Sequence, residues 1–199
     1  MHPDAGFAWH DEVAMLDFVR TAPFVRLFAQ TPAGPRVAHV PVLVGPKRTL
    51  RFHLANRNAL TASLDGAVAL AVAEGPNGYV SASWYADVRG AVPTWNYVAV
   101  EVEGPVRALG RSDLIALVDA MALELEPAVG EDWTRAKMDP ARFNALLGAI
   151  TAFELTVTAL RGTRKLSQNK RDDELAGVLD GYDRSGQHAV ADAVRDVRR

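Results

Sequence analysis

Hydrophobic and polar positions along this chain alternate mostly with a period of two, in short runs bounded by glycine and proline. Such runs are typical of half-buried β-strands joined by turns. Thr31-Pro-Ala-Gly-Pro35 is typical of a hairpin connection, and Gly75-Pro76-Asn77-Gly78 has the composition of a tight turn. The alternation predicts strands over residues 24–30, 36–44, 49–54, 67–73, 79–81, 94–102 and 150–160.

Apolar residues recur at helical spacing in fewer places. Asp11 is a suitable N-cap for a first helix that ends before Pro23. Asp139 followed by Pro140 is typical of a cap with a proline in the first turn. The other predicted helices run from Asn56 or Asn58 to Leu64, onward from Ser112, from Pro140 to Leu147, and beyond Asp172.

This order of elements favours a mainly β protein with added helices. The strands follow one another through short turns and do not alternate with helices, so an antiparallel barrel is expected and not a doubly wound sheet. We expect one domain over residues 1–171, which contains the inserted helices. A helical C-terminal extension is expected over residues 172–199.

Composition excludes several classes of protein. Of the 199 residues, 49% are hydrophobic and 23% are charged, which are values of a globular chain. The absence of cysteine excludes disulfides and thiolate metal sites. No apolar run approaches the roughly 20 residues of a membrane-spanning helix, and the first residues lack the basic and apolar regions of a secretory signal. We therefore expect a cytoplasmic protein without membrane association.

Familiar catalytic and nucleotide-binding motifs are missing from the sequence. It contains no Gly-x-Gly-x-x-Gly turn, no phosphate loop ending in Gly-Lys-Ser/Thr, and no Gly-x-Ser-x-Gly around Ser81 or Ser83. The spacing of the five histidines does not indicate a metal site. If chemistry occurs, we expect the reactive group to come from a bound cofactor.

Four segments are nevertheless richer in polar and aromatic side chains than a barrel core needs. Each has a structural alternative: a satisfied histidine at a sheet edge, asparagines that cap a helix, aromatic rings in the core, or a polar loop. Asparagines and free amides at a helix start would equally suit a phosphate. The segments are His39-Val-Pro41, residues 52–58, the aromatic pair of segments 81–85 and 93–97, and Lys165 to Lys170.

Five basic residues lie within eleven positions that contain no acid: Arg161, Arg164, Lys165, Lys170 and Arg171. The net charge of −2 gives no overall attraction to nucleic acid. The basic cluster is therefore either a solvated segment or a site for an anionic ligand.

Four strings occur in order along nearly the whole chain: His53-Leu-Ala-Asn-Arg-Asn58, Tyr79-Val-Ser-Ala-Ser-Trp-Tyr85, Val92-Pro-Thr-Trp-Asn-Tyr97 and Lys165-Leu-Ser-Gln-Asn169. Together with His39-Val-Pro41, they resemble the PaiB family of FMN-binding negative transcriptional regulators. The sequence departs from that family at Ala82, where a proline is usual, and at Arg57.

The resemblance implies an FMN-binding split barrel that forms a homodimer, with FMN in a groove between two subunits. It assigns neither a metal nor a catalytic residue. The residues it implies along the flavin and its phosphate are His39, Val40, Pro41, His53, Leu54, Asn56 and Asn58. Those it implies around the ring and at the same groove are Ser81, Ser83, Trp84, Trp95, Asn96, Lys165, Ser167 and Gln168.

The leading hypothesis is an FMN-binding homodimer of regulatory type, with DNA as a direct or an indirect partner. The sequence shows no helix-turn-helix, so direct contact would need the basic cluster and the arginine-bearing tail. The alternative hypothesis is an FMN-dependent oxidoreductase that acts on a small molecule or haem. A third is a structural dimer with an empty groove. The sequence leaves open whether the protein is an enzyme.

Overall fold

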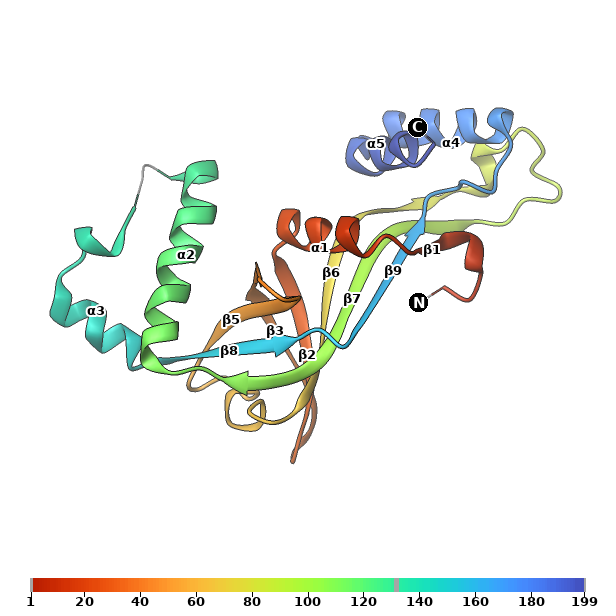
Figure 1. The fold of residues 1–199 in the computed structure, drawn as a ribbon. Helices are drawn as coiled ribbons and strands as arrows, with labels where there is room; N and C mark the ends of the chain where they lie inside the picture. The colour runs from red at the N-terminus through yellow and green to blue at the C-terminus, as the bar shows by residue number, and fades with distance from the viewer. Residues whose placement is uncertain (1, 131–132, 199) are drawn as a thin grey trace. The chain divides into compact units, whose positions relative to one another are not determined.

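The computed structural model describes residues 2–130 and 133–198. This part of the chain combines a nine-stranded sheet with five α-helices (Figure 1). The strands are β1 (Ala8–Trp9), β2 (Phe24–Thr31), β3 (Gly34–Pro41), β4 (Leu43–Gly45), β5 (Thr49–Ala55), β6 (Val68–Val80), β7 (Thr94–Ala108), β8 (Ile150–Thr156) and β9 (Ala159–Lys165). The α-helices are α1 (Glu12–Thr21), α2 (Arg111–Val129), α3 (Pro140–Leu147), α4 (Asp172–Arg184) and α5 (His188–Asp196).

Hydrogen-bonded strands follow the order β3-β2-β6-β7-β8-β5-β4, with β9 paired to β7 and β1 paired to β9. The β2–β3, β2–β6, β4–β5, β5–β8 and β7–β8 pairs are all antiparallel. Within the described residues, this path of strands does not close into a ring. The predicted mainly β, antiparallel class is confirmed. None of the described helices has the length and apolar character needed to cross a membrane.

The chain divides into two compact units. The central unit comprises Leu16–Ala73 and Glu101–Leu160. The terminal unit comprises Met1–Met15, Glu74–Val100 and Arg161–Arg199. The expected division into a 1–171 domain and a 172–199 extension stays a prediction.

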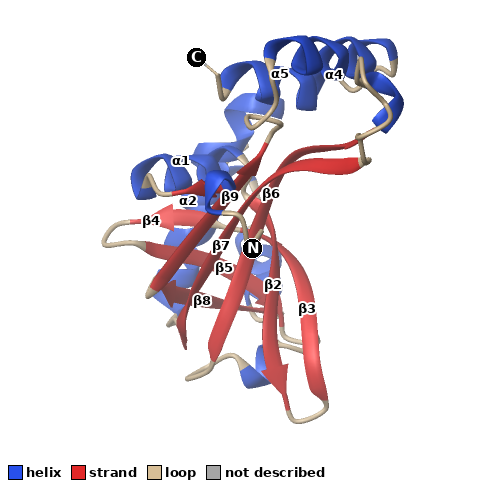
Figure 2. Ribbon diagram, turned by 90° about the vertical axis from the view of Figure 1, so that its right-hand side faces the viewer, coloured by secondary structure: helices blue, strands red, loops and turns tan. Residues whose placement is uncertain are grey.

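The β2–β3 hairpin of the central unit confirms a turn predicted from the sequence (Figure 2). Thr31 and Gly34 face each other at its end. The Thr31 hydroxyl accepts a hydrogen bond from the Ala33 amide at 3.2 Å and donates one to the Gly34 carbonyl at 2.7 Å. Gly34 has φ +97°, a left-handed conformation that glycine adopts without a Cβ clash.

Inward-facing side chains of the central strands form the core of the central unit. Phe52 on β5 and Phe153 on β8 lie directly opposite each other, with ring centroids 5.7 Å apart. Both are fully buried. A second apolar cluster joins α2 and α3 to the sheet, and its buried members are Leu43, Leu114, Leu117, Met121, Leu147 and Ala152.

The caps predicted for two helices are confirmed. The Asp11 carboxylate accepts a hydrogen bond from the Ala14 amide at 3.0 Å at the start of α1. The Asp139 carboxylate accepts one from the Arg142 amide at 2.8 Å, and Pro140 occupies the first turn of α3. Each cap satisfies an amide that has no partner within its own helix.

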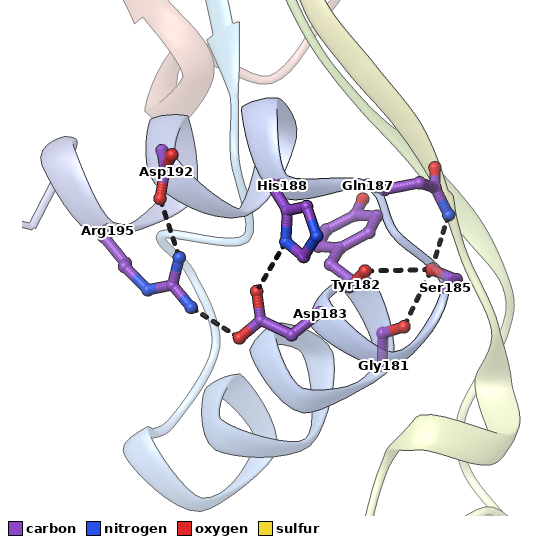
Figure 3. A network of polar contacts seen from close by, with 8 residues as sticks. All are labelled: Gly181, Tyr182, Asp183, Ser185, Gln187, His188, Asp192 and Arg195. Carbon is purple, nitrogen blue, oxygen red and sulfur yellow. Dashed lines mark hydrogen bonds and ion pairs between the residues drawn. The ribbon is translucent and has the colours of Figure 1, made fainter.

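The terminal unit contains the helices predicted beyond Asp172. Helices α4 and α5 lie side by side (Figures 1 and 2). A polar network on Asp183 joins them (Figure 3): Arg195 Nη2 lies 2.6 Å from its carboxylate, and His188 Nδ1 lies 3.6 Å away. Arg195 also binds Asp192 at 2.8 Å. The Arg195–Asp183 ion pair thus links α5 to α4, whereas the Arg195–Asp192 pair lies within α5.

Two strands predicted as continuous are broken in the structure. The predicted strand 36–44 is two strands, β3 and β4, separated at Val42. The predicted strand 150–160 ends at Thr156, and β9 begins only at Ala159. Each break lets the chain change its partner strand: β3 pairs with β2, whereas β4 pairs with β5. A change of partner leaves the alternation of apolar residues intact, so the sequence does not show it.

The expected turn at residues 75–78 is wrong, because β6 runs through it without a break. Gly78 is instead a point of close approach for the α4–α5 pair. The Tyr182 hydroxyl donates a hydrogen bond to the Gly78 carbonyl at 3.0 Å. A Cβ atom at Gly78 would lie only 2.9 Å from Cε1 of Tyr182. Packing within the terminal unit therefore overrides the local turn preference.

Candidate functional site

The predicted residues of β3 lie on the sheet of the central unit. His39 is exposed and pairs in register with Arg26 on β2. Its imidazole stacks on Phe24, with ring centroids 6.3 Å apart. Val40 is buried, and Pro41 is half-buried. Of these three residues, only His39 presents a polar side chain to solvent.

The helix expected after β5 is wrong: the chain forms turns and then only the 3-10 helix η2 (Thr61–Ser63). The asparagines stabilise those turns. Asn56 donates to the Gly148 carbonyl at 2.8 Å and accepts from the Thr151 hydroxyl at 2.8 Å. Asn58 accepts from the Leu60 amide at 3.0 Å. The α-helix start on which the expected phosphate site depended is therefore missing from these residues, and phosphate binding here stays a prediction.

His53, in contrast, has an open hydrogen-bonding atom. Its imidazole is half-buried, and Nδ1 is buried without a partner among the described residues. Burial lowers the pKa of His53. The ring is therefore neutral at physiological pH, and its two nitrogens are one donor and one acceptor. The neighbouring Leu54 is buried in the core.

A charged triad that the sequence did not indicate lies on the same face of β5 as His53. Glu154 on β8 is 6% exposed and stands opposite both Arg51 on β5 and Arg107 on β7. Arg51 Nε and Arg107 Nη2 each lie 2.6 Å from a carboxylate oxygen. Burial alone would raise the pKa of Glu154, but the hydrogen bonds and charges of the two arginines lower it.

In the terminal unit, the predicted residues Ser81, Ser83 and Trp84 lie at a short helical turn, and Trp84 packs against α4. The Ser81 and Ser83 hydroxyls are 2.7 Å apart, at the start of the 3-10 helix η3 (Ala82–Trp84). The Trp84 ring lies edge-on to Tyr182, with centroids 5.2 Å apart. A Cβ at Gly181 would lie 2.2 Å from the Trp84 ring, so only glycine permits this contact. Trp84 thus has a structural partner in α4.

Trp95 and Asn96 occupy opposite faces of β7. Trp95 is 50% exposed, donates its indole N–H to Asn77 at 3.1 Å, and lies 6.0 Å from the ring of Tyr79. Asn96 is fully buried and exchanges hydrogen bonds of 2.9 and 3.2 Å with the Ser167 hydroxyl. These hydrogen bonds bring the strings 92–97 and 165–169 together at Asn96 and Ser167, and their contact with a flavin stays a prediction.

The segment from Lys165 to Lys170 is held in place by its own polar side chains. Gln168 accepts a hydrogen bond from the Leu166 amide at 2.7 Å and donates one to the Arg164 carbonyl at 2.5 Å. Ser167 has φ +59°, which is uncommon for a residue with a Cβ. Lys165 Nζ donates to the Thr94 hydroxyl at 2.6 Å. The segment is thus a fixed structure and not a solvated loop.

A pocket of about 280 Å³ opens in the terminal unit and is called here the lysine pocket. Its polar lining includes Thr94, Asn96, Lys165, Ser167 and Lys170, together with the hydroxyl-bearing ring of Tyr85.

Tyr85 is 4% exposed, and its hydroxyl has no hydrogen-bond partner among the described residues. Lys170 Nζ lies 4.4 Å from the Tyr85 ring centroid and 3.5 Å from a carboxylate oxygen of Glu174. Burial, with the Glu174 charge, raises the pKa of Tyr85. The sequence placed Tyr85 in the aromatic segment and Lys170 in the basic cluster, but gave no sign that they meet.

A larger cavity, of about 620 Å³, lies along the second half of α2 in the central unit. Its lining includes Leu123, Pro127 and Trp133, and it contains no residue predicted to bind a cofactor. We therefore regard the lysine pocket and the His53 region as the candidate functional sites.

The antiparallel sheet that does not close into a ring, with its inserted helices, defines a split-barrel class of protein. Two of the segments that resemble the PaiB family carry a buried polar atom without a partner among the described residues. Two solved structures share this fold. The flavocytochrome Anf3 from Azotobacter vinelandii has a TM-score of 0.67 at 13% identity and covers 88% of this chain and 78% of its own. The FAD and haem binding protein from Mycobacterium smegmatis has a TM-score of 0.61 at 14% identity, with 85% and 78% covered.

Residues 1–159 match the family model described as "Putative FMN-binding domain", and the chain belongs to this family. The protease synthase and sporulation protein PAI 2 of Bacillus subtilis is 31% identical over 111 residues, which is 56% of this chain and about half (53%) of that relative's length. A protein of Emericella nidulans is 25% identical over 202 aligned positions, covering 80% of each chain. The resemblance to the PaiB family, the split-barrel fold and the flavin cofactor predicted from the sequence are confirmed.

Proposed function

We propose that this protein is a homodimeric flavoprotein of regulatory type, in which FMN is sensed or used as a redox group. One structural observation supports it beyond family membership. Within residues 2–130 and 133–198, the buried side-chain polar atoms without a partner are His53 Nδ1 and the Tyr85 hydroxyl. Native proteins pair nearly all buried polar groups, so an open one needs an explanation. Both lie in strings that resemble the PaiB family, and a ligand bound at each position would account for its open atom.

The residues of the central unit fit a flavin through His53 above all. Its neutral imidazole offers one donor and one acceptor, which suits the carbonyl and nitrogen atoms of an isoalloxazine. Asn56 and Asn58 would shape the turn beside it, and His39 and Pro41 would supply contacts from β3. When bound, FMN supplies one- or two-electron redox chemistry.

In the terminal unit, the exposed indole face of Trp95 is suited to contact with a planar ring. We propose contacts for the remaining predicted residues, Ser81, Ser83, Trp84, Asn96, Lys165, Ser167 and Gln168. Trp84, Asn96 and Gln168 already have partners within the chain, so their contribution would be through the shape of the site. Lys165 keeps two unused N–H donors.

The homodimer part of the proposal is supported by an apolar sheet face, defined by Phe24, Phe28, Val37 and Val68. These side chains are 40–65% exposed. In register, Phe28 lies between Val37 on β3 and Leu70 on β6. The solvent face of an antiparallel sheet is usually polar, and adjoining exposed apolar residues on it mark interaction sites. The Arg26–His39 pair lies on the same face between Phe24 and Phe28, so the adjoining apolar residues are those around Phe28. A second copy of the chain would cover this face through a two-fold contact.

A regulatory role through indirect contact with DNA is better supported than direct binding. Arg195 binds Asp183 and Asp192, and Arg198 binds Asp172. Of the basic cluster, Arg171 binds Asp173 and Arg164 covers the ring of Trp9 at 3.4 Å. A Lys or Arg side chain that contacts a DNA phosphate releases counterions from the DNA, and it must be available to do so. These four arginines already contact partners within the chain.

The second candidate function is an FMN-dependent oxidoreductase that acts on a small molecule or haem. It draws support from the two solved structures that share the fold, a flavocytochrome and a FAD and haem binding protein. Steady NAD(P)H consumption with an electron acceptor, strictly dependent on added FMN, would favour this function over the regulatory one.

The decisive experiment measures FMN retention and thermal stability together. FMN at 100 times its dissociation constant should stabilise the protein by roughly 2.7 kcal/mol, which raises Tm by about 5–10 °C for a chain of this length. A His53→Ala variant should retain less flavin, whereas His10→Ala, at an exposed position, should behave as the wild type. A colourless protein whose Tm does not respond to FMN would refute the proposal.

A further inference from the structure

The lysine pocket brings two ammonium groups, Lys165 and Lys170, together with one carboxylate, Asp4. His2 and Asn169 also line it, and Asp4 Oδ1 accepts a hydrogen bond from the Gly6 amide at 2.9 Å. Asn96 and the Ser167 hydroxyl bond to each other, and the Thr94 hydroxyl accepts from Lys165. A lysine ammonium has three donors and no acceptor, so Lys165 keeps two N–H groups for a ligand. Lys170 has one ion-pair partner, Glu174.

The Tyr85 hydroxyl adds a neutral donor to these two cations. Its pKa is raised, first by burial and then by the charge of Glu174, so the phenol keeps its proton through the physiological range. The hydroxyl is buried and unpaired, and Tyr85 lines the pocket. A buried unpaired hydroxyl costs free energy, which a ligand acceptor within reach would recover.

The lysines are also held in position before any ligand arrives. Lys165 Nζ lies 5.8 Å from the ring centroid of Phe7, and Lys170 Nζ lies 4.4 Å from that of Tyr85. The left-handed Ser167 between them is anchored by the buried Asn96. Strained backbone persists where surrounding contacts impose it, often at ligand sites, and fixed side chains lose less entropy on binding.

We propose that the lysine pocket binds an oxyanion, a phosphate or carboxylate group, through Lys165, Lys170 and the Tyr85 hydroxyl. Two ammonium groups and a phenol match an acceptor-rich anion, and charge-assisted hydrogen bonds are the stronger kind. A volume of about 280 Å³ lies just below the usual range for drug-sized ligands, so the pocket suits a small group. The oxyanion is either the phosphate of FMN, in which case the inference rests on the proposed function, or part of a separate small molecule.

The test titrates inorganic phosphate into the full-length protein without added flavin and follows the amide resonances of Thr94 and Ser167. The wild type should show saturable shifts. The Lys165→Met/Lys170→Met variant should bind phosphate at least tenfold more weakly. Lys47→Met removes an exposed lysine of the central unit and is the control for charge. Identical titrations of the wild type and the double variant would overturn the inference.

Tyr85→Phe keeps both charges and the buried ring, so it tests the hydroxyl without the risk of misfolding. It should weaken phosphate binding severalfold, whereas Tyr79→Phe, at a 47% exposed tyrosine, should not. Unchanged phosphate affinity in Tyr85→Phe would remove the hydroxyl from the site and contradict the inference as stated.

Two further arms identify the source of the oxyanion. If it is the FMN phosphate, FMN should displace inorganic phosphate. Riboflavin, which lacks the phosphate, should then bind the wild type more weakly than FMN does, and this difference should disappear in the Lys165→Met/Lys170→Met variant. If it belongs to a second molecule, phosphate should still bind the FMN-loaded protein. Phosphate binding in a protein that retains no FMN would uphold the pocket and refute the proposed function, so the two failures are distinguishable.

Discussion

Arg51 on β5 and Glu154 on β8 lie directly opposite each other, and Arg51 Nε donates a hydrogen bond to Glu154 Oε2 at 2.6 Å. Arg107 approaches the same carboxylate from β7. The triad therefore links three adjacent strands of the central unit across a buried negative charge. A buried carboxylate is tolerated only when it is paired and hydrogen-bonded, so Glu154 should be sensitive to substitution.

Glu154→Gln should lower the free energy of unfolding by about 2 kcal/mol, because hydrogen bonds to charged groups contribute roughly 1.5–3 kcal/mol each and the two arginines are partly solvated. For a chain of this length, Tm should fall by about 4–8 °C. The measurement is chemical and thermal unfolding at neutral pH. Glu124→Gln makes the same chemical change at an exposed position on α2 and should leave Tm within experimental error.

The stability contributed by Glu154 should also depend on pH. Its pKa in the folded protein is lower than in the unfolded chain. The contribution is therefore complete above the unfolded pKa, about 4.3, and is lost as the pH falls through the folded pKa. The difference in unfolding free energy between wild type and Glu154→Gln should shrink between pH 6 and pH 3. A constant difference over that range would show that the carboxylate is not stabilised in the folded state.

Gly181→Ala should loosen α4 from Trp84, because the added methyl would lie 2.2 Å from the indole ring. Overpacking of this kind costs about 1–3 kcal/mol. Hydrogen exchange should accelerate over residues 172–196 and remain unchanged over β5 and β8. Gly90→Ala is the matched control, since a Cβ there meets no atom within 4 Å. Equal protection in both variants would argue against the Trp84–Gly181 contact.

Phe28→Arg should convert the proposed dimer into a monomer, because it would bury an unpaired guanidinium in the apolar sheet face that the second copy covers. Light scattering coupled to gel filtration should then give the chain mass of 21.5 kDa in place of twice that value. Leu123→Arg introduces the same charge at an 80% exposed leucine on α2 and should stay dimeric. A wild type that elutes as a monomer at micromolar concentration would reject the homodimer.

Several features could be predicted from the sequence because their causes are local. Asp11 and Asp139 cap helices through amides three residues away, and the β2–β3 turn is fixed by Thr31 and Gly34. Four strings in a fixed order were enough to indicate the family and its flavin. These signals depend on residues that are close in sequence, so they do not depend on the tertiary structure.

The candidate site was only partly predictable. Asn96, Lys165 and Ser167 were predicted and do line one pocket, whereas Tyr85 and Lys170 gained importance only from their position in it. Asn56 matched the motif equally well, yet its side-chain amide is already hydrogen-bonded to the Gly148 carbonyl and the Thr151 hydroxyl. Whether a polar side chain is free for a ligand depends on partners that are distant in sequence.

The sequence by itself determined the mainly β, antiparallel class, the two caps, the absence of cysteine chemistry and the class of cofactor. Only the tertiary structure decided where strands change partners, why Gly78 is a packing contact and not a turn, and which buried polar atoms remain open. The physical reason is the same for all three. Local conformational preferences amount to about 1 kcal/mol per residue, and burial and hydrogen bonding between distant segments outweigh them.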